Sequence, residues 1–142
     1  MIAIGCDQGG FELKKDIMAY LDEKGYEYKD FGSYSEASVD YPEYAKKVCA
    51  AINDGSCDKG ILICGTGIGI SIAANKIKRI RAALCTDCFM AEATRLHNDA
   101  NVLALGGRVI GPGLAVKITE TFLTTEFSNE ERHIRRINML EN

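Results

Sequence analysis

The sequence predicts an α/β fold, a three-layer αβα sandwich built on a Rossmann-like sheet of five parallel strands. Two observations indicate this class. Short apolar runs typical of buried strands alternate with amphipathic stretches typical of helices. Four of the apolar runs also stop at a small or polar cluster, as strands do where such sheets bind ligands. Strict alternation of this kind requires parallel strands with helices on both faces of the sheet.

The expected strands cover residues 2–6, 26–31, 60–64, 81–85 and 102–105. Two amphipathic helices separate the first three strands, and the second of them ends at Gly55, because glycine is common at helix ends. Each has apolar side chains on one face: Leu13, Ile17, Tyr20 and Leu21 in the first, and Tyr44, Val48 and Ile52 in the second. Further helices are expected over residues 68–77, 87–97 and 113–125, with a C-terminal one from about residue 129.

Length and composition fit one unit of this kind. The chain has 142 residues, of which 46% are hydrophobic and two are prolines, so we expect a single domain over residues 1–142. A net charge of −3 argues against a protein that coats nucleic acid or anionic membranes. No apolar run approaches the roughly 18 residues of a membrane span, and the N-terminus lacks the features of a signal peptide. We therefore expect a cytoplasmic protein whose six cysteines are free thiols.

The most informative motif is the segment ILICGTGIGIS at residues 61–71, an apolar strand that runs through glycines into a helix. The N–H groups of Thr66 to Gly69 start that helix without partners, and together with the helix dipole they favour an anion. The spacing matches neither a Walker loop nor the GxGxxG motif of dinucleotide folds, so a small anion or oxyanion fits better. The alternative is a tight glycine turn that serves packing alone.

Cys64 occupies the last strand position before those amides, where their positive partial charges favour the thiolate. It is therefore a candidate base or nucleophile, although a cysteine that ends an apolar strand also fits a small core residue. Cys85 and Cys88 form a CxxC motif, but the chain has no second pair to complete a zinc site. We expect no metal.

Two further positions could handle protons. His97 ends a predicted helix and is followed by Asn98 and Asp99, so it could transfer protons near neutral pH or cap the helix by its charge. Asp7 follows the first strand, where it could orient a sugar hydroxyl, share a proton or cap the next helix.

A basic cluster occupies the C-terminal helix. Arg132 and Arg136 are one turn apart with His133 beside them, an arrangement that suits a phosphate dianion. The apolar residues Ile134, Ile137 and Leu140 are expected towards the opposite side. The alternative is a solvated basic face without a ligand.

Several segments match one family in order along the chain: IAIGCD, GFELKK, DYP at 40–42, GILICGTGIGISIAANK, IRAAL, HNDANVL, GGRVIG and RHIRRI. With them the sequence closely resembles type B ribose-5-phosphate isomerase over nearly its whole length. The ICGTGIGISIAANK block is specific to the wider family, which also contains galactose-6-phosphate and allose-6-phosphate isomerases. The HND and RHxxR elements favour the ribose-type branch.

The resemblance implies that Cys64 is the base, which removes a proton from the carbon next to the sugar carbonyl to form a cis-enediolate. It implies that Thr66 helps to move protons between O1 and O2. The loop that stabilises the enediolate oxygen is matched by Gly65, Gly67, Ile68 and Gly69.

The resemblance also implies binding roles. His97 and Asp7 match residues that open the furanose ring, and Tyr41 and Asn98 match sugar contacts. The phosphate grip is matched by Arg108, Arg132, His133 and Arg136. Family members are homodimers whose active sites draw residues from both subunits.

One position departs from the family pattern, which usually has Asp-His after the first strand where this chain has Asp7-Gln8. Gln8 matches a substrate-contacting position, yet it can hydrogen-bond without exchanging a proton near neutrality. We expect an aldose–ketose isomerase of phosphorylated sugars, without metal or cofactor, acting on ribose 5-phosphate. The alternatives are allose 6-phosphate or galactose 6-phosphate as substrate, or a non-catalytic sugar-phosphate sensor.

Overall fold

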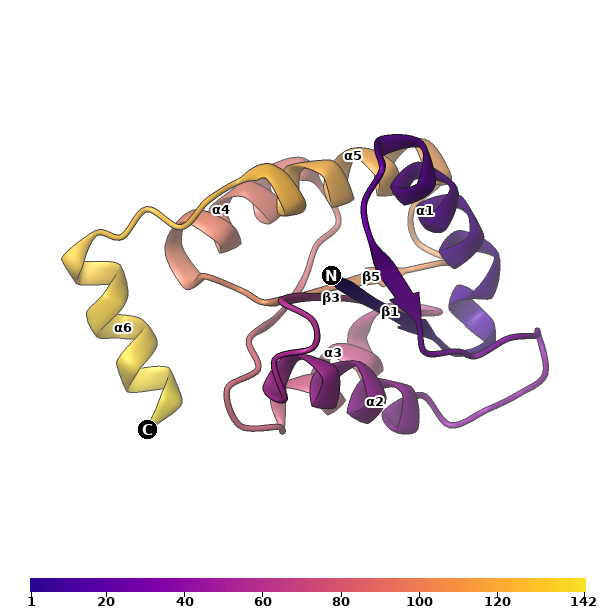
Figure 1. Ribbon diagram of the computed structural model, residues 1–142, viewed down its shortest axis with the longest axis horizontal. Helices are drawn as coiled ribbons and strands as arrows, with labels where there is room; N and C mark the ends of the chain where they lie inside the picture. The colour runs from indigo at the N-terminus through magenta and orange to yellow at the C-terminus, as the bar shows by residue number, and fades with distance from the viewer.

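The computed structural model describes residues 1–142 and contains five strands and six α-helices (Figure 1). The strands are β1 (Ile2–Cys6), β2 (Tyr28–Asp30), β3 (Lys59–Cys64), β4 (Ala82–Leu84) and β5 (Val102–Gly106). The helices are α1 (Phe11–Lys24), α2 (Tyr41–Asn53), α3 (Ile68–Asn75), α4 (Cys88–Asn98), α5 (Pro112–Thr124) and α6 (Glu131–Glu141). One turn of 3-10 helix, η1 (Gln8–Gly10), precedes α1.

The strands form one sheet in the order β2-β1-β3-β5-β4, and every pair is parallel. In the centre, Cys6 of β1 lies opposite Ile63 of β3, and Cys64 of β3 lies opposite Gly106 of β5. The carboxyl ends of these three strands therefore meet at the same edge. Every residue of β1 and β5 is buried, as expected for strands covered by helices on both faces.

Helices cover both faces of the sheet and create a hydrophobic core on each side (Figure 1). Helices α1, α4 and α5 pack on one face, where Ile17 and Phe122 are fully buried. Helices α2 and α3 pack on the other face around Val48 and Ile70. Helix α6 lies apart at one end of the molecule, and His133 is its only buried residue.

The predicted fold class is confirmed, and most element bounds differ by one or two residues. The expected strand over residues 26–31 is shorter in the structure, where β2 is an edge strand that pairs with β1 alone. The predicted core face of α2 was shifted: Tyr44 is half-buried, whereas Ala45 and Cys49 are fully buried. All six cysteines carry free thiols, as predicted. None of the helices combines the length and the apolar character needed to cross a bilayer.

Candidate active site

The segment after β3 has the sharp turn that its glycines predicted. Gly67 adopts a left-handed backbone conformation, with φ of 79°, immediately before α3 begins. A Cβ atom at this position would lie 2.6 Å from Cδ1 of Leu84 and 2.8 Å from the carbonyl carbon of Leu105. Both the conformation and the space therefore require glycine. We call residues 65–69 the glycine loop.

Several amides of the glycine loop are available to a ligand. The N–H groups of Gly65, Thr66 and Gly69 donate to no group of the protein. The amide of Ile68 donates to Oγ1 of Thr66 at 3.2 Å, and that of Gly67 donates to Sγ of Cys64 at 3.1 Å. The expectation that every amide from Thr66 to Gly69 is unpaired is therefore wrong for Gly67 and Ile68. The free amides and the start of α3 together form a candidate anion site.

Cys64 differs from the buried Cys49 and Cys85 in its polar surroundings. Its side chain is buried at the end of β3, and its sulfur accepts the hydrogen bond from the Gly67 amide. Burial in apolar surroundings instead raises the pKa of both Cys49 and Cys85 to about 12. These two thiols stay protonated at neutral pH, and neither sulfur has a partner like the Gly67 amide that donates to Cys64.

Three of the predicted site residues surround the glycine loop. Arg108 lies beside Gly65, where a Cβ would be 3.4 Å from its Nη1, and its amide donates to the Gly65 carbonyl at 2.9 Å. The ring of Tyr41 lies against Gly69, so that a Cβ there would be 2.7 Å from its Cζ. Asp7 is buried and its Oδ1 accepts the Gly9 amide at 2.8 Å, which makes it the cap of η1.

Gln8 links two loops at this edge of the sheet. Its Oε1 accepts a hydrogen bond of 2.9 Å from the amide of Val39, which lies just before α2 and Tyr41. The side-chain amide of Gln8 is left to donate to another group.

The remaining predicted residues gather in a second place, around α6. His97, Asn98, Arg132, His133 and Arg136 line a cavity of about 420 Å³ together with Ile137 and Leu140. The expectation that Ile137 and Leu140 lie away from the basic residues was therefore wrong. The buried residue His133 faces α4, and Ile137 and Leu140 follow it by one and two helical turns on the same face.

His133 joins α6 to α4. Its ring lies 4.6 Å from that of His97, measured between centroids, and its Nδ1 shares a hydrogen bond of 2.8 Å with Oγ of Ser128. Burial, the nearby Arg132 and the ring of His97 lower the pKa of His133, and Glu130 opposes them only in part. The lowered pKa favours the neutral form of His133 near pH 7, and Arg132 and Arg136 each bring a positive charge to this cavity.

The glycine loop lies at the carboxyl ends of the strands, whereas the α6 cavity lies at their amino ends. The glycine loop follows the carboxyl end of β3, while His97 and Asn98 end α4, just before the amino end of β5. The five residues of β5 rise roughly 13 Å between the two edges. Within one copy of the chain, Arg108 thus lies near Cys64, whereas the α6 arginines do not.

Comparison with known proteins gives one consistent answer. The profile of the ribose/galactose isomerase family matches residues 2–140. Ribose-5-phosphate isomerase B of Escherichia coli is 49% identical, over 96% of this chain and 91% of that protein. The chain belongs to the ribose/galactose isomerase family.

Solved structures within the ribose/galactose isomerase family have the same fold. Ribose-5-phosphate isomerase B of Clostridium thermocellum superposes with a TM-score of 0.97 at 52% identity, covering 99% of this chain and 94% of that one. A ribose 5-phosphate isomerase of Thermotoga maritima also gives 0.97, at 54% identity and with 99% and 96% coverage. The resemblance stated from the sequence motifs is confirmed.

Two residues of this family member that support the site were missed in the sequence. Lys14 is almost fully buried, and its Nζ donates to Oδ1 of Asp30 at 2.7 Å and to the carbonyl of Ser33 at 2.5 Å. It thereby fixes the loop that leads to Val39. A signal was present, because Lys14 lies between Leu13 and Ile17 on the apolar face of α1. The second residue is Arg81, which holds the C-terminal end of α6.

Proposed function

We propose that this chain interconverts ribose 5-phosphate and ribulose 5-phosphate without a metal or other cofactor. The observation that carries the proposal is the position of Cys64, whose buried sulfur accepts an amide of a loop with further unpaired amides. A base and an oxyanion site side by side are what proton abstraction next to a carbonyl requires. Membership of the ribose/galactose isomerase family supports the same reaction class.

In the proposed reaction the Cys64 thiolate takes the proton from C2 of the open-chain aldose. The electron pair of that C–H bond forms the C1–C2 double bond of a cis-enediolate. The amides of the glycine loop donate to the oxygen on which negative charge develops, where preorganised donors have their largest effect. The thiol then returns the proton to C1, which gives the ketose, while the Thr66 hydroxyl passes a proton between O1 and O2.

The ring of the sugar must open before this step, and we assign that role to His97 and Asp7. Asp7 uses Oδ1 to cap η1, so its second oxygen is the one available to a sugar hydroxyl. Sugar contacts are proposed for Tyr41, Gln8 and Asn98.

We further propose a homodimer in which α6 of one copy covers the glycine loop of the other. The separation of Cys64 from the α6 cavity within one chain supports this arrangement, because a single sugar phosphate must reach both. Exposed apolar side chains support it as well: Phe89 at the start of α4 is 77% exposed and Leu140 on α6 is 67% exposed.

In the dimer Arg108 would meet Arg132 and Arg136 of the partner around the phosphate, with His133 as a neutral donor or acceptor. This phosphate anchor would supply binding energy far from the reacting carbons. The cytoplasmic location stays a prediction from the sequence.

A substrate panel tests the proposal. Ribose 5-phosphate, allose 6-phosphate and galactose 6-phosphate are assayed for aldose–ketose conversion with and without a chelator, and in deuterium oxide. We expect the highest kcat/KM with ribose 5-phosphate, deuterium in the product, and no effect of the chelator. A higher kcat/KM with a hexose phosphate would contradict the substrate, and binding without any conversion or exchange would contradict the enzyme itself.

A further inference from the structure

Helix α6 has few contacts with the rest of the chain. It follows a segment without regular structure over residues 125–130, and all but two of its residues are exposed. Figure 1 shows it beside the end of α4 and away from the sheet. The place of its arginines therefore depends on how its two ends are held.

The N-terminal end of α6 is held by His133 and Ser128. Besides the hydrogen bond to His133, Ser128 donates its amide to the carbonyl of Leu96 in α4 at 3.3 Å. These contacts fix the first turn of α6 against α4. They leave the direction of the helix axis open, because a helix held at one turn can still swing.

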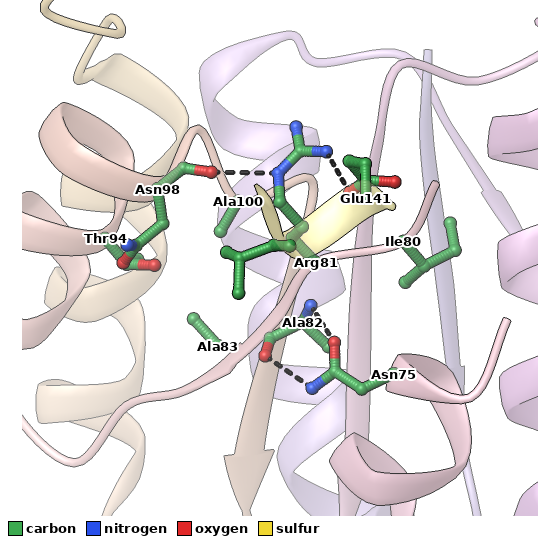
Figure 2. A pocket seen from close by; sticks show the side chains of 10 residues that line it. Asn75, Ile80, Arg81, Ala82, Ala83, Thr94, Asn98, Ala100 and Glu141 are labelled. Carbon is green, nitrogen blue, oxygen red and sulfur yellow. Dashed lines mark hydrogen bonds and ion pairs between the residues drawn. The ribbon is translucent and has the colours of Figure 1, made fainter. Parts of the chain in front are cut away.

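The C-terminal end of α6 is held by Arg81, as Figure 2 shows. The guanidinium donates from Nη1 to Oε1 of Glu141 at 2.8 Å. Its other nitrogens donate to the carbonyls at the end of α4, Nε to Asn98 at 2.9 Å and Nη2 to Asp99 at 2.8 Å. One side chain thus connects the last turn of α6 to the residue that follows His97.

Arg81 is itself held firmly, so it can fix the distance between the end of α4 and the end of α6. Its own amide donates to Oδ1 of Asn101 at 2.8 Å, and its carbonyl accepts the amide of Asn101 at 3.0 Å. The side chain is about four-fifths buried and lines a second cavity of about 450 Å³. Asn98 and Leu140 line both this cavity and the α6 cavity. A cation is also favoured at the carbonyl end of α4. The guanidinium is therefore oriented before Glu141 reaches it.

We propose that Arg81 is a positioning residue, which clamps Glu141 so that Arg132 and Arg136 face His97 and Asn98 at the separation a sugar phosphate needs. Arg81 itself touches no substrate. The inference rests on the proposed phosphate role of α6 and adds to it the element that sets its geometry. A partly exposed ion pair contributes little to folding, so the effect of its loss falls on substrate binding.

The test compares Glu141→Gln with Glu131→Gln, which removes the same charge from the exposed first turn of the same helix. KM and kcat for ribose 5-phosphate are measured, together with the inhibition constant of inorganic phosphate and the melting temperature. For Glu141→Gln we expect both KM and the inhibition constant to rise about three- to fivefold, because a partly exposed ion pair is worth about 1 kcal/mol. We expect an unchanged kcat and melting temperature, and no effect in Glu131→Gln. In Arg81→Met, which also loses the α4 carbonyls, the rise should be about tenfold.

Arg136→Ala separates this inference from the proposed function. If Arg136→Ala weakens phosphate inhibition while Glu141→Gln behaves like Glu131→Gln, the phosphate role stands and the positioning role of Arg81 is overturned. If Arg136→Ala leaves phosphate inhibition unchanged, both are overturned. A drop in kcat of Glu141→Gln with an unchanged KM would also overturn the positioning role.

Discussion

The glycine loop and helix α6 are held in place by opposite means. Backbone groups fix the glycine loop: the carbonyls of Cys64 and Gly65 accept the amides of Gly107 and Arg108 at 2.8 and 2.9 Å. Side chains fix α6, through the ring of His133 and the clamp between Arg81 and Glu141. The difference matches the two roles proposed for these regions, because stabilising charge on a reacting oxygen needs preorganised donors, whereas anchoring a distant phosphate tolerates small adjustments.

The largest effect should come from replacing the proposed base beside the glycine loop. Cys64→Ala should lower kcat by about 10²- to 10⁴-fold, because a positioned base typically contributes that much. Cys57→Ala is the matched control, since Cys57 is equally buried in the same hydrophobic cluster. Steady-state kinetics on folded protein checks both. If Cys64→Ala keeps more than a tenth of the wild-type kcat while Cys57→Ala is normal, the sulfur is not the base.

The second effect tests how rigid the glycine loop is. Gly67→Ala should destabilise the protein by about 2–4 kcal/mol, because it combines left-handed strain with contacts closer than 3 Å. Gly25→Ala has nearly the same φ, 76°, but no atom within 4 Å of the added Cβ, so it should cost about 1 kcal/mol. Urea unfolding measures both. Equal losses in the two variants would mean that packing around Gly67 is looser than described.

The smallest effect concerns the α6 side of the comparison. Because the pKa of His133 is lowered in the folded protein, the unfolded chain binds more protons between that value and 6.5. Stability should therefore fall as the pH drops through this range. His133→Gln should reduce that pH dependence, which melting temperatures at pH 7.5 and pH 5.5 would show. An identical pH dependence in the variant would mean that folding does not lower the pKa of His133.

Much of the glycine loop and its surroundings could be predicted from the sequence, because their structure depends on residues close together in the chain. The strand into Cys64, the turn at Gly67 and the start of α3 lie within one short segment, and each follows from residue type. The face of α2 was harder to predict, because Tyr44 and Ala45 are neighbours and only packing decides which is buried. The buried Lys14 was missed because lysine is ordinarily exposed.

The arrangement at α6 could not be predicted in the same way. The residues that clamp it, Arg81 and Glu141, are 60 positions apart in the chain and have no shared pattern. The position of His97 could be predicted from topology, because a residue that ends a helix before a parallel strand lies at the amino ends of the strands. That rule places His97 opposite Cys64. The motifs group both residues into one site, and only the family resemblance indicated that such a site draws on two chains.

Mixing two defective variants, assayed at a ribose 5-phosphate concentration far below the KM of Arg136→Ala, tests the shared site most directly. Cys64→Ala and Arg136→Ala proteins are unfolded together and refolded as an equal mixture, alongside each variant treated alone. If α6 of one copy completes the glycine loop of the other, half of the dimers are mixed and each contains one intact site, so activity should return to about one quarter of the wild-type level. If the mixture is no more active than the average of the two variants alone, the site does not combine residues from two copies of the chain.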